Sequence, residues 1–386
     1  MYQNQISQIP DRASFFSIIA HPLIFFHTML FLAMLVVTTA IAETTIDMGN
    51  GAALRFEFGS FSQDHTKADL EKITIIQDGA ILLTAESLSY QTYQLDGVTI
   101  LATSSAEDVS FDAPDIIVKA SSVKARNLPL TEETARQARI ASQSPLFVQA
   151  EDVSILVKKE PFLKIDVGTF ELDEGTGLIN PPPQSTTFAI SDIQITSQKN
   201  VAFMAGLSLL GLTELSLDLT GSAQTRAHNQ LVFLQSNFHI DFTKLGSLTF
   251  SSEVSGSKDA ITTLLTTQQQ APEQLISSLN SGWNDITFNN AEIEIADEGL
   301  LAHLETSGQI PPPKQLAASL SASASLFLPV NGTRIAGPIG DFLVKSGNLI
   351  ISFYPEVAPQ FNDFPELANS PDELIDQLGI DVSHRL

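Results

Sequence analysis

Ala85-Glu86-Ser87-Leu88-Ser89-Tyr90 is the first copy of a phrase that recurs along the first half of the chain. Clear copies follow at Ala106-Glu107-Asp108-Val109-Ser110-Phe111 and Ala150-Glu151-Asp152-Val153-Ser154-Ile155, and weaker copies start at Ala125 and Ile190. Apolar residues alternate with small or polar ones in each copy, which is the period of a half-buried β-strand. Because such a repeat is typical of stacked, quasi-linear architectures, we expect an elongated, repetitive antiparallel sheet.

The remaining pattern predicts a mainly β chain with a few helices that cover the sheet. We expect a repetitive β-sheet region over residues 43–200, with one helix near 131–142, and a second β-sheet region over 201–386. The second region carries helix signals near 258–281, 315–325 and 371–378, and a short apolar helix signal over Ala202–Leu212. Ser257 and Ser370 are the expected N-caps, and Asp78-Gly79 is the clearest hairpin turn. Asn331-Gly332 is interpreted as a turn rather than as part of a glycosylation sequon.

The N-terminal segment, residues 1–42, predicts export. From Leu23 to Val37 the chain is almost wholly apolar, and Ala40 and Ala42 match the small-residue cleavage pattern of a signal peptide. An uncleaved anchor is the alternative, because the stretch from Phe15 to Ala42 is long enough to span a bilayer. Both interpretations place the rest of the chain on the far side of the membrane, and membrane association follows only if the segment stays uncleaved.

Composition excludes several classes of function. The chain has 44 acidic and 20 basic residues and a net charge of −24, so it repels phosphate backbones, and nucleic acid is not an expected partner. It has no cysteine, which removes disulfides, thiol catalysis and cysteine-based zinc sites. Its 43% hydrophobic residues argue against intrinsic disorder.

One constellation suggests an enzyme. Ser255-Gly256-Ser257-Lys258, Ser278-Leu279-Asn280 and Lys345-Ser346-Gly347 follow the order of the three motifs of penicillin-binding serine acyl-enzymes. In such enzymes the serine attacks and the lysine takes part in proton transfer. However, the spacing is short for a transpeptidase core, and a serine-rich chain produces such short matches by chance.

No other pattern predicts a catalytic, cofactor or metal site. The five histidines after residue 42 are scattered singly, which does not favour a metal site. Glu292 and Glu294 lie two residues apart on an expected strand, which is more typical of a solvated strand face than of an acid–base pair. We therefore expect a protein that is not an enzyme, with no catalytic, cofactor-binding or metal-binding residues and no cofactor.

The repeats resemble the sheet segments of AsmA/TamB-type proteobacterial envelope proteins. The resemblance rests on the Ala-Glu-Asp-Val-Ser phrase, on Leu215-Ser216-Leu217-Asp218-Leu219-Thr220-Gly221 and on Leu245-Gly246-Ser247-Leu248-Thr249-Phe250. The segment Ala291–Leu300 is similar to stretches of uncharacterised exported proteins. The resemblance implies a periplasmic location, or an inner-membrane anchor facing the periplasm, and a role in handling lipid or other envelope components.

Three hypotheses about function follow. The first is an envelope protein that binds lipid or another envelope component on an apolar sheet face, because large uncovered apolar surfaces are seldom without function. The second is a periplasmic scaffold for protein interactions that uses an open sheet edge. The third is the serine acyl-enzyme.

Overall fold

The computed structural model describes residues 44–49, 52–62, 66–95, 98–129, 146–159, 162–175, 184–261, 285–360 and 371–386. The chain divides into two compact units, residues 1–159 (unit 1) and 160–386 (unit 2), whereas the sequence pattern placed the boundary at residue 200. The predicted N-terminal signal or anchor segment 1–42 and the predicted helix 131–142 lie outside the described residues. No helix among the described residues has the length and apolar character needed to cross a membrane.

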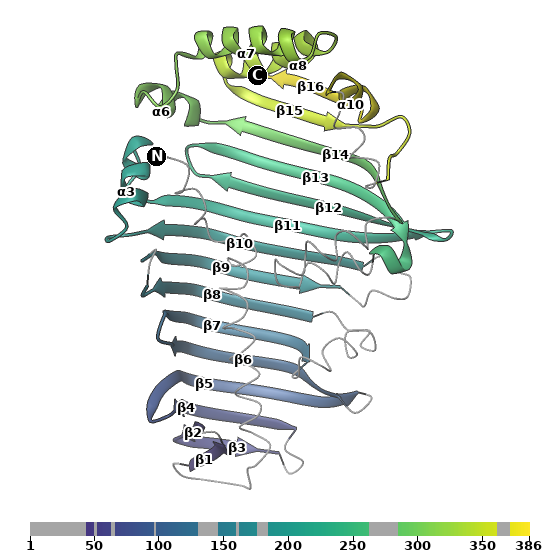
Figure 1. Cartoon of the computed structure of the whole chain (residues 1–386). Coiled ribbons are helices and arrows are strands. Elements are labelled where there is room, and N and C mark those ends of the chain that lie inside the picture. The colour runs from purple at the N-terminus through teal and green to yellow at the C-terminus, as the bar shows by residue number, and fades with distance from the viewer. Residues whose placement is uncertain are drawn as a thin grey trace. The chain divides into compact units, whose positions relative to one another are not determined.

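The described part of unit 1 consists of antiparallel strands (Figure 1). Consecutive strands pair from β4 through β8 within the unit, β1 pairs with β2, and both β2 and β3 pair with β4. Asp78 and Gly79, with φ of 51° and 81°, form the predicted hairpin turn between β4 and β5. The strands are β1 Thr44–Gly49, β2 Ala52–Phe56, β3 Phe58–Phe61, β4 Lys67–Gln77, β5 Ala80–Leu95, β6 Val98–Asp112, β7 Ile116–Pro129 and β8 Leu146–Val157.

At the repeated phrase, the alternation of inward-facing and outward-facing side chains along the strand shifts by one residue. Its third residue has a left-handed backbone in four copies: Asp108, Asn127, Asp152 and Asp192 have φ between 49° and 55°. Such a residue turns the chain so that two successive side chains point outward together. Strict alternation was therefore the wrong prediction inside the phrase, where buried residues stand three apart, as in Ala150 and Val153. Asp and Asn recur at this position because their short polar side chains tolerate a left-handed backbone.

Unit 2 is a second antiparallel arrangement of eight described strands, with helices at its end and along its edge (Figure 1). Consecutive strands pair from β9 through β16. The strands are β9 Lys164–Glu174, β10 Gln184–Thr196, β11 Leu215–His228, β12 Leu231–Phe242, β13 Gly246–Ser257, β14 Ile286–Asp297, β15 Gly347–Phe353 and β16 Ile380–Arg385. The helices are α3 Val201–Leu209, α6 Leu300–Thr306, α7 Pro313–Phe327, α8 Gly332–Lys345 and α10 Pro371–Gln377.

These elements confirm the mainly β, antiparallel prediction for each unit. Helices α3, α7 and α10 lie at positions that the sequence predicted. The Ser257 hydroxyl accepts a hydrogen bond from the Ala260 amide over 3.2 Å, as expected of an N-cap. Of the helix predicted near 258–281, residues 258–261 are helical, and residues 262–284 lie outside the described part.

Two helices of unit 2 were not predicted, and one turn was predicted wrongly. Asn331 is the N-cap residue of α8, and Gly332 is its first residue, so this pair starts a helix instead of joining two strands. Gly332 is buried, and a Cβ there would lie 2.7 Å from the Ala324 carbonyl oxygen. Close packing of α7 against α8 therefore explains the glycine better than turn geometry does.

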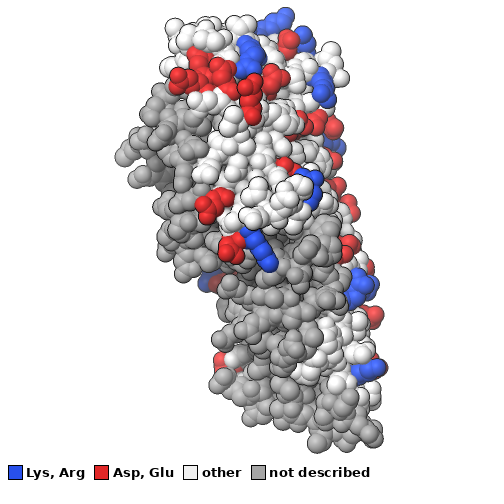
Figure 2. Space-filling model, turned by 90° about the vertical axis from the view of Figure 1, so that its right-hand side faces the viewer, with Lys and Arg blue, Asp and Glu red and all other residues white. Residues whose placement is uncertain are grey.

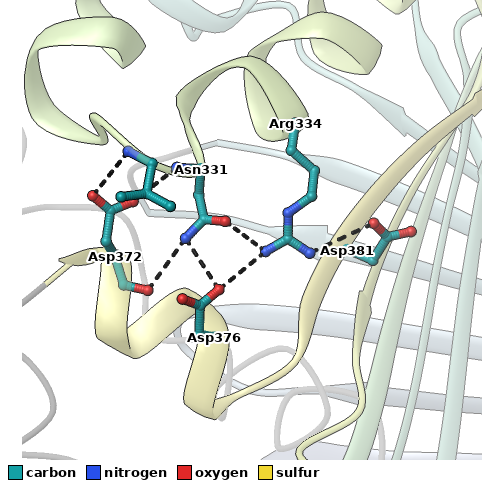
Figure 3. A network of polar contacts seen from close by, with 6 residues as sticks. Asn331, Arg334, Asp372, Asp376 and Asp381 are labelled. Atoms are coloured by element: carbon teal, nitrogen blue, oxygen red, sulfur yellow. Dashed lines mark hydrogen bonds and ion pairs between the residues drawn. The ribbon is translucent and has the colours of Figure 1, made fainter.

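A polar network fastens α10 and β16 to the start of α8 (Figure 3). The side-chain amide of Asn331 donates to the Asp372 carbonyl and to Asp376 Oδ1, over 3.4 and 3.1 Å. Its oxygen accepts from Arg334 over 2.9 Å, and Asp372 Oδ1 accepts from the Asn331 backbone amide over 3.0 Å. Because Asn331 is 6% exposed and uses both amide donors, it is a structural residue and not an accessible glycosylation site.

Candidate functional site

The buried apolar side chains of unit 1 form one continuous face of its sheet, here called the apolar face of unit 1. It is built from rows of residues that stand directly opposite one another on β4 to β8, and every member is at most 7% exposed. One row runs Leu70, Leu88, Ala106, Val123 and Ala150, and the next runs Ala68, Tyr90, Ser104, Ala125 and Val148. Beyond the phase change the face continues through Ile73, Ile75, Leu83, Ala85, Val109, Val118, Ala120, Val153 and Ile155.

No described element of unit 1 is a helix, so none lies over this face in the way helices usually cover a sheet. Unit 2 provides the contrast, because α8 packs on β15 and β16 there. Phe342 of α8 forms a core with Leu349 and Val382, and Ile335 and Ile339 of the same helix pack against it. A described helix thus covers this part of unit 2, whereas no described helix covers the face of unit 1, although its residues are buried.

Two hydroxyl groups stand in the apolar face of unit 1 without a hydrogen-bond partner. Tyr90 and Ser104 are directly opposite each other on β5 and β6, and each is 6% exposed. Their hydroxyl oxygens are buried and have no partner in the structure. Burial raises the pKa of the Tyr90 hydroxyl to about 12, so the group stays protonated and remains a donor at ordinary pH.

The apolar face of unit 2 is less completely buried between β11 and β13. One row there runs Phe188, Gly221, Phe238, Phe250, Ile293, Ile351 and Val382. Phe238 is half-buried and Phe250 is 36% exposed, although Val382 at the end of the same row is 6% exposed under α8. Gly221 makes room for the Phe188 ring, since a Cβ at this position would lie 2.2 Å from it.

A shallow hollow of about 310 Å³ lies over β9 to β13 of unit 2, with mainly polar side chains around it. Within it, His239 Nδ1 and Thr249 Oγ1 are hydrogen-bonded over 2.9 Å, and Asn237 donates to Ser222 over 3.4 Å. These side chains thus satisfy one another. The hollow is lined by Glu171, Thr187, Phe188, Ala189, Thr220, Gly221, Ser222, Asn237, Phe238, His239 and Thr249.

The structure does not bring the acyl-enzyme motifs together. Ser255 is paired with Thr287 near the start of β14, whereas Gly347 is paired with Asp297 at its end. Ten residues of strand between Thr287 and Asp297 correspond to about 34 Å, which is too far for a shared site. Ser255 donates to Asn289 over 3.1 Å, and Lys345 pairs with Asp341 over 3.0 Å. Ser278 and Asn280 lie outside the described residues.

The remaining candidate side chains have structural partners. Glu292 accepts a hydrogen bond from Ser352 over 3.1 Å, and Glu294 accepts one from Asn348 over 2.9 Å, both across the β14–β15 pair. Among the described residues no group of three or more His, Asp or Glu side chains is arranged to hold a metal ion. Sequence reasoning missed Tyr90 and Ser104, because a hydroxyl in an alternating strand carries no signal of its own.

On the face that Figure 2 shows, charged side chains lie along one margin and in a group of acidic side chains near the top. Figure 2 shows acidic and basic side chains next to one another along one margin of the view. Lys124 pairs with Glu151 over 3.7 Å, and Lys72 donates to Glu57 over 2.6 Å. The hydrogen bond and the charge of Glu57 raise the pKa of Lys72. Such exposed pairs indicate a solvated surface.

Comparison with known proteins gives one match. A family model described as "Uncharacterized protein" matches residues 239–385, from within β12 to the end of β16. This part of unit 2 holds α8, α10 and the Asn331 network. No curated protein and no solved structure matches the chain.

Proposed function

We propose that this chain is an exported, non-enzymatic envelope protein that binds lipid, or another apolar envelope component, on the apolar face of unit 1. The observation that carries the proposal is the extent of that face: rows of Leu, Ile, Val and Ala run across five strands, and they are at most 7% exposed although no described helix of the unit lies over them. Hydrocarbon chains that replace the present neighbours of these buried side chains need no specific polar partners there.

Three further points support the proposal. The N-terminal apolar segment Leu23–Val37 is typical of an export signal. The repeats resemble those of AsmA/TamB-type envelope proteins, and this resemblance supports a periplasmic location. Two motifs of the acyl-enzyme alternative lie apart, since Ser255 is paired with Thr287 and Gly347 with Asp297 at opposite ends of β14.

The test is the lipid content of the full chain. The protein is purified from the soluble and membrane fractions of a Gram-negative host, extracted with organic solvent and analysed by mass spectrometry. After delipidation it is mixed with vesicles and separated again to measure uptake. We expect acyl lipid at a fixed ratio to protein in both measurements. Absence of lipid from both would reject the proposal.

A matched pair of variants locates the binding surface. Ala106→Phe places a ring on the apolar face between Leu88 and Val123, whereas Ser105→Phe places the same ring on the opposite, exposed side of β6. We expect Ala106→Phe to reduce the lipid-to-protein ratio several-fold and Ser105→Phe to leave it unchanged, with circular dichroism as the check on folding. Equal lipid content in the two folded variants would place the lipid elsewhere.

A scaffold for envelope proteins is the second candidate, and an observation in unit 2 favours it. Leu326, Phe327 and Val330, where α7 meets α8, are 79%, 74% and 77% exposed. Large side chains so exposed at one turn are typical of a contact surface. Cross-linking in intact cells, compared between the natural chain and Phe327→Ser, tests this role: products that persist unchanged in the variant speak against it.

A further inference from the structure

Helix α3 of unit 2 is apolar and yet exposed. Its residues, Val201–Leu209, include no charged side chain and a single serine. Val201, Met204 and Leu209 are 78%, 46% and 44% exposed, and within the helix only Leu207 is buried. A helix that is apolar on all sides normally lies in a protein core or in a membrane. The surroundings of α3 in the structure therefore do not match its composition.

The exposed side chains of α3 share one half of the helix. At 100° per residue, Val201, Met204 and Leu209 fall within one half, and the buried Leu207 lies on the other. The helix is fixed at its start, because the side-chain oxygen of Asn200 accepts a hydrogen bond from the Phe203 amide over 2.9 Å. A regular, capped helix thus presents its apolar half outward.

α3 lies at one end of the strands of unit 2, with α6 beside it (Figure 1). Ile195 near the end of β10 is paired with Leu215 at the start of β11, so the helix between them projects from this end of the sheet. A Cβ on Gly211, just after α3, would lie 3.6 Å from the His303 ring of α6. Leu300, the first residue of α6, is 37% exposed. Both helices therefore bring apolar side chains to the same end.

The segments at this end of the sheet carry little net charge. By strand register they are residues 197–214, 243–245 and 298–306, and their charged residues are Lys199, Glu214, Lys244, Glu298 and Glu305. The whole chain, in contrast, has 44 acidic and 20 basic residues. A nearly neutral border suits zwitterionic headgroups. A groove on a partner protein is the less suitable occupant, because protein interfaces end in a polar rim and the exposed half of α3 has no charged residue.

We infer that α3 is a membrane-contact element that enters the surface layer of a zwitterionic bilayer. Val201, Met204 and Leu209 lie among the upper parts of the acyl chains, and Lys199 keeps its charged end at the level of the headgroups. The inference goes beyond the proposed function, because it names a contact with the bilayer that does not involve the apolar face of unit 1. It also does not require the N-terminal segment to stay uncleaved.

A fluorescent probe at a single position tests the inference. The chain has no cysteine, so Met204→Cys provides one attachment site for an environment-sensitive dye. Gln230→Cys is the matched control, since it is exposed in the turn between β11 and β12, at the other end of β11. The labelled full chain is mixed with phosphatidylcholine vesicles, with and without nitroxide groups on the acyl chains. We expect the dye at residue 204 to become several-fold brighter and to be quenched by the nitroxide, and the dye at residue 230 to stay unchanged.

A second set of variants shows whether the helix or the dye causes insertion. Val201→Gln with Leu209→Gln, made in the Met204→Cys chain, keeps good helix formers but removes two apolar side chains. We expect the vesicle affinity that the dye reports to fall about tenfold. Leu231→Gln, at a residue that is 46% exposed at the other end of the sheet, should leave this affinity unchanged.

Three results would overturn the inference. They are a dye at residue 204 that stays in water when vesicles are added, an unchanged affinity in the double glutamine variant, and a dye that responds to a soluble periplasmic extract but not to vesicles. The last result would identify a protein as the occupant of α3. Lipid content is measured separately, so a chain that carries lipid but keeps residue 204 in water loses only this inference. A chain that inserts α3 but carries no lipid loses only the proposed function.

Discussion

At the scale of single residues, the third position of the repeated phrase shows how backbone conformation determines side-chain direction. Asp152 has φ of 49°, and its carboxylate accepts a hydrogen bond from Ser121 on β7 over 2.9 Å. In unit 2, Asp192 takes the same conformation, and its amide donates to Asp218 on β11 over 2.7 Å. Asp152 is thus tied to the preceding strand and Asp192 to the following one, so each of these two left-handed residues is anchored to a neighbouring strand.

Replacing Asp152 by valine should lower the free energy of unfolding by about 1–2 kcal/mol, because a β-branched residue is strained in the left-handed region. Asp152→Asn should stay within about 0.5 kcal/mol of the natural chain, since asparagine tolerates this conformation and keeps an acceptor for Ser121. Urea unfolding followed by circular dichroism gives both values. Similar losses for the two variants would show that the charge matters and the backbone conformation does not.

The buried hydroxyl of Tyr90 predicts how stability depends on alkaline pH. Its pKa is raised from 10.0 to about 12, so the folded state holds the proton more tightly than the unfolded state does. The contribution of this proton to the free energy of unfolding is fully present below pH 10. It is lost as the pH rises towards 12, by about 2–3 kcal/mol in total.

Tyr90→Phe should abolish this part of the loss of folding stability at alkaline pH, because the variant has no proton to lose at this position. Tyr354→Phe changes a side chain that is 57% exposed, so the loss of folding stability at alkaline pH should stay as in the natural chain. Denaturant unfolding of the three proteins between pH 9 and pH 11.5 measures the difference. Parallel stability curves for Tyr90→Phe and the natural chain would contradict the prediction.

At the scale of elements, Asn331 joins three pieces of unit 2 that are separate along the chain. It starts α8, and it bonds to Asp372 and Asp376 of α10, while Arg334 approaches Asp381 of β16 to within 4.0 Å (Figure 3). β16 pairs only with β15 among the described strands, so its attachment depends on this network and on Val382 under α8.

Asn331→Ala should therefore loosen α10 and β16, at a cost of about 1–3 kcal/mol, because it removes the hydrogen bonds that the buried Asn331 side chain makes to Asp372, Asp376 and Arg334. Amide hydrogen exchange measures the effect: exchange in α10 and β16 should speed up, while β12 and β13 stay as protected as before. Thr333→Ala, at an exposed residue of the same helical turn, is the matched control. Equal exchange in the two variants would mean that apolar packing alone holds these elements.

At the scale of the whole molecule, the net charge of −24 governs which surfaces the protein approaches. Anionic vesicles should repel it and zwitterionic ones should not, because charge repulsion acts over about one Debye length.

Lipid uptake from anionic vesicles should therefore become faster as salt is raised from 20 to 300 mM, whereas uptake from zwitterionic vesicles should change little. A fluorescent phospholipid that is quenched in the vesicle reports the rate. Faster uptake from anionic vesicles at low salt would contradict this, since it would require a basic contact patch.

The sequence by itself determined the fold class of this protein, which is mainly β. Alternating residues in Ala106–Phe111 and Ala150–Ile155, the Asp78-Gly79 turn and the caps of α10 are local signals, so they predicted strands, a hairpin and a helix without any knowledge of distant contacts. Only the tertiary structure decided what depends on cross-strand register: Tyr90 opposite Ser104, Ser255 far from Lys345, and Asn331 as a buried helix cap. Residues that meet across strands or between helices are far apart in the chain, and no local pattern records which of them will be neighbours.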